Sequence, residues 1–469
     1  MIHVIRQIER RLGHRPGEGR VAARAMLLSV LLLLLGAGAL LSSRASAQDF
    51  DPAREAQKAL DAMDAGDFAV VHARFDATMA AAVSAEQLAQ GWKSLAAQVG
   101  PLQSRGEPDV KTRDTGELVT IPMHYERGEL LAIFTFDNER KMSGFAIRPA
   151  PAAKPAAAAP VPADANYRES ELQLGEGEGA LPATLAMPNG KGPFPAVVLV
   201  HGSGPQDRDQ TIGPNRPFLD IARGLAERGI AVLRYEKRTK THPQQFADGG
   251  TIDLETTDDA VTAAALLRMQ PGIDPKRVFV LGHSQGGMMA PRIGARDPQI
   301  AGLILLAAPS RPLMDILIEQ NRRLAILNDG KTSDSENAAI QQLVDSVNAA
   351  RGGREIAAAQ APMGVSAAYW RSVDAVSPVA EAKAIAQPML ILQGARDIQV
   401  VDADWQGWKE AFHDSPRATF KLYETLNHLA IPGEGDGNLQ EYQTPGQVAP
   451  ELIADIAQWI SARTPKKKK

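Results

Sequence analysis

The strongest constraint on the fold is an alternation of short apolar runs with amphipathic stretches from residue 194 onwards. Stretches with helical patterning, such as 216–228, 252–269 and 446–463, separate runs that are rich in aliphatic residues. The apolar runs lie at 194–200, 229–235, 277–282, 301–308, 388–394 and 418–423. Alternating β and α segments form a mostly parallel sheet with helices on both faces. The sequence therefore predicts a doubly wound α/β domain over 166–469, with ligands bound at the carboxyl ends of the strands.

One of these runs ends in a serine turn. The stretch "VFVLGHSQGGMMA" (278–290) passes from a buried strand through Ser284 into the start of an apolar helix. Gly282 and Gly286, two residues either side of the serine, permit a tight turn that exposes the central side chain. We predict that Ser284 is a nucleophile and that the two glycines form its nucleophile elbow.

A serine hydroxyl needs a histidine to remove its proton and an acid to orient that histidine. Asp397 directly follows one apolar run, and His428 lies just past the last run. Adjacent strand ends suit an acid and a base that must touch, so we predict the triad Ser284, Asp397 and His428. Asp402 and Asp404 are weaker alternatives for the acid, because they lie inside the next helix.

The run 194–200 ends in the glycine-rich stretch "HGSGPQDRDQ". Such a turn lets backbone N–H groups point into the space above the sheet, where an oxyanion hole needs two donors. We predict one donor from Gly202 or Ser203 and the other from the N–H of Gln285. His201 is expected to anchor the loop structurally.

The charged residues of this loop have partners nearby in the sequence. Asp207, Arg208 and Asp209 are expected to form salt bridges with Lys237 or Arg238, in preference to a metal site. The chain has no cysteine, which excludes disulfides, thiolate nucleophiles and cysteine-ligated zinc. Its net charge of −4 argues against nucleic acid as a partner. We predict neither metal nor cofactor.

Nearly eighty residues separate the fourth of these runs from the fifth, more than one crossover helix needs. The segment contains amphipathic stretches and a capping box formed by Ser333 and Glu336. Helices inserted after the run 301–308 are expected to form a cap, about 311–385, over Ser284. Five residues are candidates to line an acyl pocket, with packing of the cap against the core as the alternative role for each: Met314, Leu317, Met363, Tyr369 and Trp370.

Residues 1–47 are not expected to belong to the fold. An arginine-rich start precedes the apolar run 26–41, and Ala45-Ser46-Ala47 follows, so we predict a signal peptide cleaved before Gln48. The alternative is an uncleaved anchor, but sixteen residues span only about 24 Å of a hydrocarbon core of about 30 Å. The sequence therefore predicts an exported protein, periplasmic or secreted, with no stable membrane span after cleavage.

The stretch 148–165 is nearly all alanine and proline and predicts a stiff linker. It separates the large domain from a small α+β domain at 48–147. Helices are expected within 54–75 and 84–100, followed by a three-stranded meander over 118–147.

Taken together, "HGSGPQDRD", "RYEKRT", "GHSQGG", "GARD" and the late "NH" resemble bacterial α/β-hydrolase esterases, close to the serine-aminopeptidase-like branch. The resemblance covers most of 166–463, and 50–147 resembles the small domain of unknown function that precedes such hydrolases in exported proteins. It implies acyl-ester hydrolysis without a cofactor, on a triad of Ser284, Asp397 and His428.

Fold does not choose the substrate. We expect a serine carboxylesterase that acts on a small-molecule ester through an acyl-enzyme. A peptidase or amidase of the same fold is the alternative, and a non-catalytic binding protein is disfavoured by the intact triad and oxyanion loop. The sequence leaves the oligomeric state open.

Overall fold

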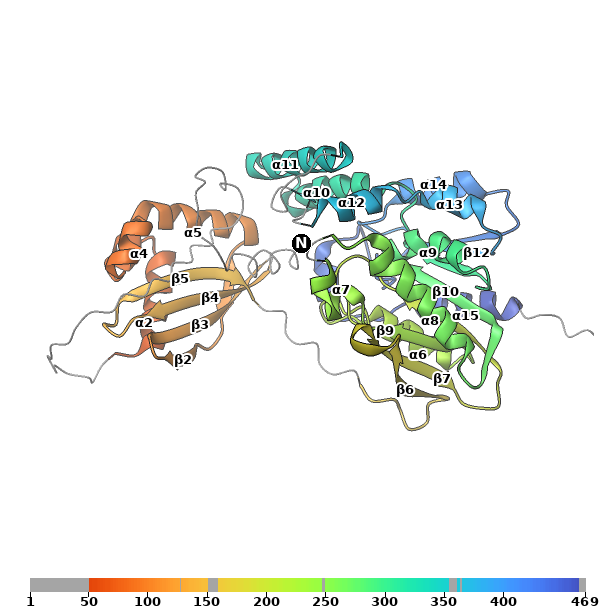
Figure 1. Cartoon of the computed structure of the whole chain (residues 1–469). Coiled ribbons are helices and arrows are strands. Elements are labelled where there is room, and N and C mark those ends of the chain that lie inside the picture. Colours follow the sequence, from red (N-terminus) through yellow and green to blue (C-terminus); the bar gives the residue numbers. More distant parts are fainter. Residues whose placement is uncertain are drawn as a thin grey trace, which may run out of the picture. The chain divides into compact units, whose positions relative to one another are not determined.

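The computed structural model describes residues 50–126, 128–150, 159–246, 249–353, 361–362 and 365–463. Within them the chain forms two compact units, a small one up to residue 150 and a larger one from residue 159 (Figure 1). The signal segment predicted at 1–47 and much of the predicted linker lie outside the described residues, so the predicted boundaries stay predictions.

The small unit is an antiparallel sheet with helices against it. Its strands are β1 (Leu102–Arg105), β2 (Asp109–Arg113), β3 (Gly116–Tyr125), β4 (Gly128–Phe136) and β5 (Met142–Pro149), in the order β1-β3-β4-β5 with β2 paired to β3. Its helices are α2 (Pro52–Asp64), α3 (Phe68–His72), α4 (Ala77–Ala82) and α5 (Ala85–Val99). The predicted α+β class is confirmed, and β3, β4 and β5 form the predicted meander.

Two details of the small unit differ from expectation. The helix expected within 54–75 is broken, because Gly66 adopts φ +83° and starts a turn after α2. The strands β1 and β2 were not predicted. In β2 every residue is exposed, so no alternation of buried and exposed positions indicates a strand.

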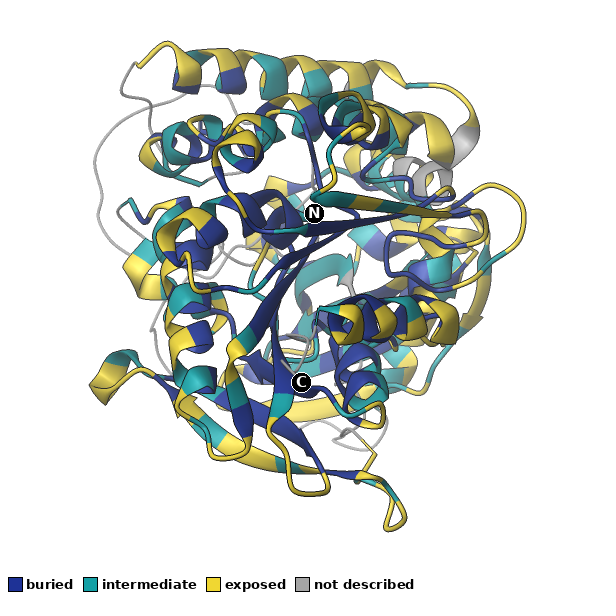
Figure 2. Cartoon of the chain, turned by 90° about the vertical axis from the view of Figure 1, so that its right-hand side faces the viewer, coloured by how far each residue is buried: buried dark blue, intermediate teal, exposed yellow. Residues whose placement is uncertain are grey.

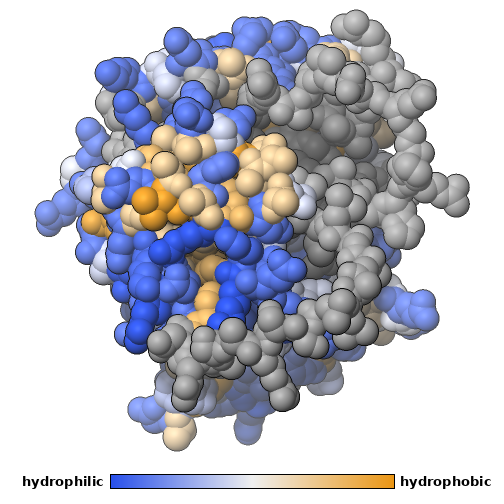
Figure 3. All heavy atoms as spheres, turned by 90° about the vertical axis from the view of Figure 1, so that its left-hand side faces the viewer, coloured by the Kyte–Doolittle hydropathy of each residue, from blue (hydrophilic) through white to orange (hydrophobic). Residues whose placement is uncertain are grey.

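Most described atoms on the face in Figure 3 belong to hydrophilic residues, with a limited apolar area among them.

The large unit contains an eight-stranded sheet. Its strands are β6 (Tyr167–Leu174), β7 (Leu181–Pro188), β8 (Phe194–Val200), β9 (Ala231–Tyr235), β10 (Ile273–His283), β11 (Leu303–Leu306), β12 (Met389–Gly394) and β13 (Ala418–Tyr423). The order is β13-β12-β11-β10-β8-β9-β7-β6, parallel from β13 to β9 and antiparallel at β7 and β6. This confirms the predicted doubly wound α/β class. β9 and β10 lie on opposite sides of β8, so the strand order reverses there, where such sheets bind ligands.

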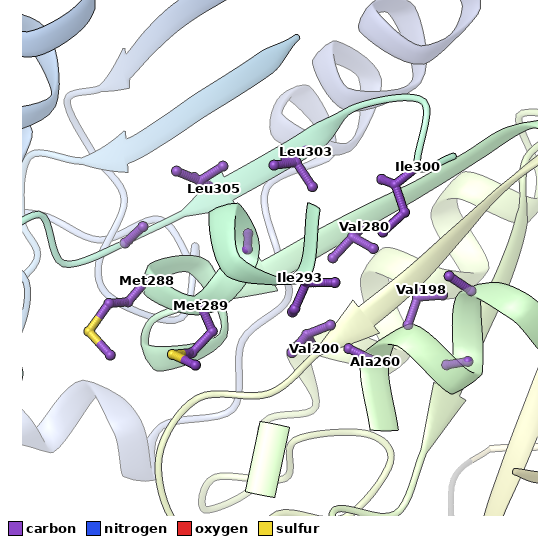
Figure 4. Close-up of a cluster of buried hydrophobic side chains, with 14 of the residues drawn as sticks. Val198, Val200, Ala260, Val280, Met288, Met289, Ile293, Ile300, Leu303 and Leu305 are labelled. Carbon is purple, nitrogen blue, oxygen red and sulfur yellow. The ribbon is translucent and has the colours of Figure 1, made fainter. Parts of the chain in front are cut away.

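Helices cover both faces of this sheet. Val197 and Leu199 of β8 pack with α6 and α15, whereas Val198 and Val200 pack with α8 and α9. Figure 4 shows this second layer around Val200, and Figure 2 shows buried strands between half-exposed helices. Burial on both faces is why the central strands are continuous apolar runs.

The helices outside the cap are α6 (Pro217–Ala226), α7 (Arg238–Thr241), α8 (Asp258–Arg268), α9 (Gln285–Arg296), α14 (Asp402–Phe412) and α15 (Pro450–Ala462). The short helical turns are η1 (Gly177–Gly179), η2 (Pro243–Phe246), η3 (Asp253–Thr257) and η6 (Leu439–Gln443).

Between the sixth strand of this sheet, β11, and β12, the described residues form the helices α10 (Leu313–Asp329), α11 (Asp334–Arg351), α12 (Ala367–Asp374) and α13 (Pro378–Ala384). The predicted capping box of Ser333 and Glu336 begins α11. Met314 and Trp370 are buried in the same hydrophobic cluster as α9, so they join the cap to the core, and Met363 lies outside the described residues.

Candidate active site

The nucleophile elbow lies between β10 and α9. Ser284 has φ 54° and ψ −120°, a left-handed backbone that non-glycine residues rarely adopt. It is half-buried, whereas His283 and Gln285 on either side are buried. Such strain is kept where the surroundings over-determine it, and here it presents one hydroxyl at the carboxyl edge of the sheet.

Two glycines make the elbow possible. A Cβ on Gly286 would lie 2.2 Å from the carbonyl oxygen of Val200, on the neighbouring strand β8. A Cβ on Gly282 would lie 2.1 Å from the carbonyl oxygen of Gly286 itself. No side chain tolerates such contacts, so the close approach of strand, turn and helix requires glycine at both positions.

The predicted acid and base touch each other. His428 Nδ1 lies 2.8 Å from Asp397 Oδ2, and both side chains are buried. The other carboxylate oxygen, Oδ1, accepts the backbone N–H groups of Gln399 (2.8 Å) and Val400 (3.0 Å). The carboxylate therefore holds a proton on His428 Nδ1, an assignment made from its partners, and leaves Nε2 free to act as a base.

Arg396 fixes the loop that carries His428. Its guanidinium donates to the carbonyl oxygen of Glu434 (2.8 Å) and pairs with the carboxylate of Glu441. Glu441 also accepts from Asn427 Nδ2 at 3.0 Å, immediately before the histidine. Arg396 precedes Asp397, so one side chain ties the acid's loop to the base's loop.

The elbow meets this loop through His283. Its ring Nε2 donates to the backbone oxygen of His428 (2.7 Å), and the two ring centroids lie 4.7 Å apart. The residue before the nucleophile thus contacts the backbone of the base. Among the described residues the Ser284 hydroxyl has no hydrogen-bond partner.

The oxyanion loop is anchored to the elbow by Gln210. The N–H of Gly202 donates to Gln210 Oε1 (2.8 Å), and Gln210 Nε2 donates to His283 Nδ1 (2.8 Å). Of the two predicted loop donors, the Gly202 N–H therefore already has a partner. Within the described part of the chain, neither the Ser203 N–H nor the Gln285 N–H donates to another protein group.

Gly202 nevertheless lies against the nucleophile. A Cβ built on it would be 3.3 Å from Ser284 Cβ. The peptide that joins Gly202 to Ser203 therefore starts beside the Ser284 side chain.

Two buried histidines near the loop are neutral. Burial, with the neighbouring His428 imidazole, lowers the pKa of His283 to about 3. Burial, with the Lys237 charge, lowers the pKa of His201 to about 3 as well. As predicted, His201 anchors the loop, with Nε2 3.0 Å from the carbonyl oxygen of Asp207. Neither ring is a candidate for the general base.

The salt bridges predicted between residues 207–209 and Lys237 or Arg238 are wrong. Lys237 pairs with Glu255 (2.6 Å) and Arg238 pairs with Asp259 (2.6 Å). Successive side chains leaving a strand point to opposite sides, so the residue before Lys237 meets the loop and Lys237 turns inward. The loop's close partners are Glu171, Arg234 and Glu236. Among the described residues no cluster of His, Asp and Glu is arranged to hold a metal.

The alternative acids lie elsewhere. Asp404 is fully buried, and it accepts the N–H of Ser310 (3.0 Å) and pairs with Arg311 (2.8 Å). It ties the start of the cap to α14. Asp402 is exposed at the first residue of α14.

Two segments of the chain match known protein families. Residues 193–436, more than half of it, match the family described as Serine aminopeptidase, S33. The chain belongs to this family. Residues 56–145 match a family described as Protein of unknown function (DUF3887).

Relatives of this S33-family chain include esterases. It is 33% identical over 383 residues to Esterase EstD of Thermotoga maritima, covering 81% of this chain and 88% of that protein. Est1E from Butyrivibrio proteoclasticus, a solved structure, is 16% identical with a TM-score of 0.40, covering 62% of this chain and 98% of that one. An esterase of Pyrobaculum calidifontis is 16% identical with a TM-score of 0.40, covering 63% and 85%. The expected α/β-hydrolase membership is confirmed, and the protein is an esterase-type hydrolase.

Sequence reasoning missed four residues around the candidate site: Gln210, Lys237, Glu255 and His283. The sequence positions of two of them could have indicated a place near the site. Lys237 stands two residues past the end of β9, at the same sheet edge as the triad, and His283 lies within the serine motif. Gln210 and Glu255 carried none, because only folding brings their partners to them.

Proposed function

We propose that this protein is a carboxylesterase that cleaves small carboxylic esters through an acyl-enzyme on Ser284. The observation that carries the proposal is the strained, half-buried serine on the sheet edge that also holds the buried His428–Asp397 pair. A serine hydroxyl becomes a useful nucleophile near neutral pH only with such a base.

In the proposed reaction, His428 Nε2 takes the proton of Ser284 Oγ as this oxygen attacks the ester carbonyl carbon. The carbonyl oxygen becomes an oxyanion that accepts the N–H groups of Ser203 and Gln285. Collapse of the tetrahedral intermediate expels the alkoxide, which takes the proton from His428. Water then attacks the acyl-enzyme by the same steps and releases the acid and the free serine.

Esters are favoured over aminoacyl amides because the two carboxylates of α10 that the structure describes, Asp315 and Glu319, are already paired with arginines. An aminopeptidase needs acidic groups free to bind the substrate amine. Here Asp315 pairs with Arg351 (2.6 Å), and Glu319 pairs with Arg311 (2.7 Å) and Arg323 (2.6 Å). The family description leaves a peptidase as the second candidate.

The test is a Ser284→Ala variant assayed on p-nitrophenyl butyrate and on alanine p-nitroanilide. We expect ester turnover by the wild type, little anilide turnover, and a loss of at least about 10³-fold in kcat in the variant. A fluorophosphonate should label the wild type alone. The matched control, Ser346→Ala on α11, should keep full activity.

Two results would contradict the proposal. Wild-type turnover by Ser284→Ala would remove the acyl-enzyme mechanism. Anilide cleavage that rivals ester cleavage and disappears in the variant would make the protein a peptidase.

We also propose that the protein is exported. The support is the leader-like sequence over 1–47. Separately, no helix of the described residues is sufficiently long and apolar to span a bilayer. N-terminal sequencing of the protein from periplasmic and medium fractions should begin at Gln48. A chain that keeps its first residues in the membrane fraction would instead indicate an anchor.

A further inference from the structure

The peptide bond between Gly202 and Ser203 is held from its carbonyl side by a buried lysine. Lys237 Nζ donates to the carbonyl oxygen of Gly202 at 2.7 Å, and the lysine side chain is 1% exposed. This oxygen and the Ser203 N–H belong to one planar trans peptide and point in opposite directions. A group that fixes the oxygen therefore also fixes the direction of the Ser203 N–H.

The lysine is kept in this position by a buried carboxylate. Glu255 Oε1 lies 2.6 Å from Lys237 Nζ, and the Glu255 side chain is 3% exposed. An unpaired ammonium would be costly at this depth, so the pair lets a cation stand beside a peptide carbonyl. Charge-assisted hydrogen bonds are the stronger ones, and a bond to one end of a peptide polarises the other end.

The second carboxylate oxygen is occupied by the cap. Glu255 Oε2 accepts the hydroxyl of Tyr369 on α12. Burial and the Glu255 charge raise the pKa of Tyr369, so its hydroxyl keeps the proton that it donates. The next residue, Thr256, accepts the side-chain amide of Gln285 at 3.4 Å. The same turn therefore supports both residues whose N–H groups are free at the site.

We infer that Lys237 is a positioning residue of the oxyanion hole, which fixes and polarises the Gly202–Ser203 peptide so that the Ser203 N–H meets the developing oxyanion. This inference rests on the proposed function. Gln210 holds the other side of Gly202, through its N–H. Lys237 contacts the carbonyl oxygen of this peptide, on the side opposite to the N–H that would meet substrate. Lys237 would therefore affect the reaction only through the orientation and polarisation of the backbone.

The test replaces the pair in one step, with Lys237→Met and Glu255→Gln together, so that neither charge is left buried alone. We expect kcat on p-nitrophenyl butyrate to fall about 10- to 100-fold and KM to change less than about threefold. Lys240→Met is the matched control, because Lys240 is 42% exposed and pairs with Glu236. It should keep wild-type kcat.

A second readout separates positioning from general damage. A trifluoromethyl ketone adds to the serine and places an oxyanion in the hole, whereas the matching secondary alcohol binds without one. The affinity for the ketone should fall about as much as kcat/KM, and that for the alcohol should stay within about threefold. Because both ligands bind only folded molecules, the ratio does not depend on how much of the variant folds.

A double variant that keeps the wild-type ratio of the two affinities would overturn the inference. Lys237→Gln with Glu255→Gln retains an amide in the buried site, and should lose ketone affinity in the same direction if the Met variant does not fold. Failure of the proposed function looks different, because the wild type itself would then form no ketone adduct and take no fluorophosphonate label.

Discussion

The nucleophile elbow and the oxyanion loop lie side by side, yet they are built by opposite means. The elbow depends on side chains that are missing, since Gly282 and Gly286 allow backbone contacts that no Cβ permits. The oxyanion loop depends on polar side chains that arrive from elsewhere, Gln210 at one side of Gly202 and Lys237 at the other.

This difference predicts how each region fails. A steric requirement is met or violated, so damage to the elbow should be nearly all-or-none. Hydrogen bonds and charges can be weakened in steps, so damage to the loop should be graded and should alter rate more than fold. The following predictions test that contrast, from the largest expected effect to the smallest.

The largest effect is expected from Gly286→Ala. Its Cβ would lie 2.2 Å from the Val200 carbonyl and 2.6 Å from the His201 carbonyl. We expect a loss of about 3 kcal/mol or more in the free energy of unfolding, or no soluble protein at all. Denaturant titration measures it. Gly179→Ala is the control, because a Cβ at this position would lie an ordinary 3.8 Å from its nearest neighbour, Arg238 Nη1. Wild-type stability in Gly286→Ala would remove the steric account of the elbow.

The next effect is expected from Gln210→Ala. It leaves the Gly202 N–H and His283 Nδ1 unpaired in a buried place, which costs about 2 kcal/mol. We expect a folded protein whose kcat falls about tenfold, since the loop loses one anchor. Gln173→Ala, at an exposed position of β6, should match the wild type in both measurements. An unfolded Gln210→Ala would show that the loop is as strictly required as the elbow.

A smaller effect concerns pH. The pKa of His283 is about 3 in the folded protein, below its value in the unfolded chain. At a pH between these two pKa values, His283 is protonated in the unfolded chain and neutral in the native state. Stability contributed by this group is therefore lost as pH falls below about 6.5. Between pH 7.5 and 5.5 the wild type should lose about 1.4 kcal/mol more than His283→Gln.

Denaturant titration at both pH values measures this difference. His413→Gln, at an exposed position, should keep the wild-type loss. Equal losses in the wild type and His283→Gln would mean that His283 is not a neutral buried donor in the native state.

The smallest effect is expected from Ser203→Ala. The proposed donor is the backbone N–H of Ser203, which alanine retains, so kcat/KM should stay within about twofold. A steady-state assay on p-nitrophenyl butyrate measures it. A loss above about tenfold would assign the oxyanion contact to the side-chain hydroxyl instead.

Much of the fold could be predicted, because burial leaves a periodic trace in the sequence. The runs at 194–200 and 418–423 match β8 and β13 residue for residue. The edge strand β6 and its neighbour β7 were missed. In β6 the reason is that exposed polar positions are mixed with few buried ones. Hydrophobic periodicity reports which side of an element is covered and says little where an edge is half-exposed.

Ser284, Asp397 and His428 could be singled out from sequence because parallel strands end at one edge, and the structure puts the last two in contact. The sequence by itself thus determined the fold class, the family and the positions from which a triad can be chosen. Only the tertiary structure decided that Gln210 bonds His283, 73 residues away, and that Lys237 bonds Gly202, 35 residues away. A polar side chain takes its partner from whatever folding brings within about 3 Å, and no local pattern encodes that choice.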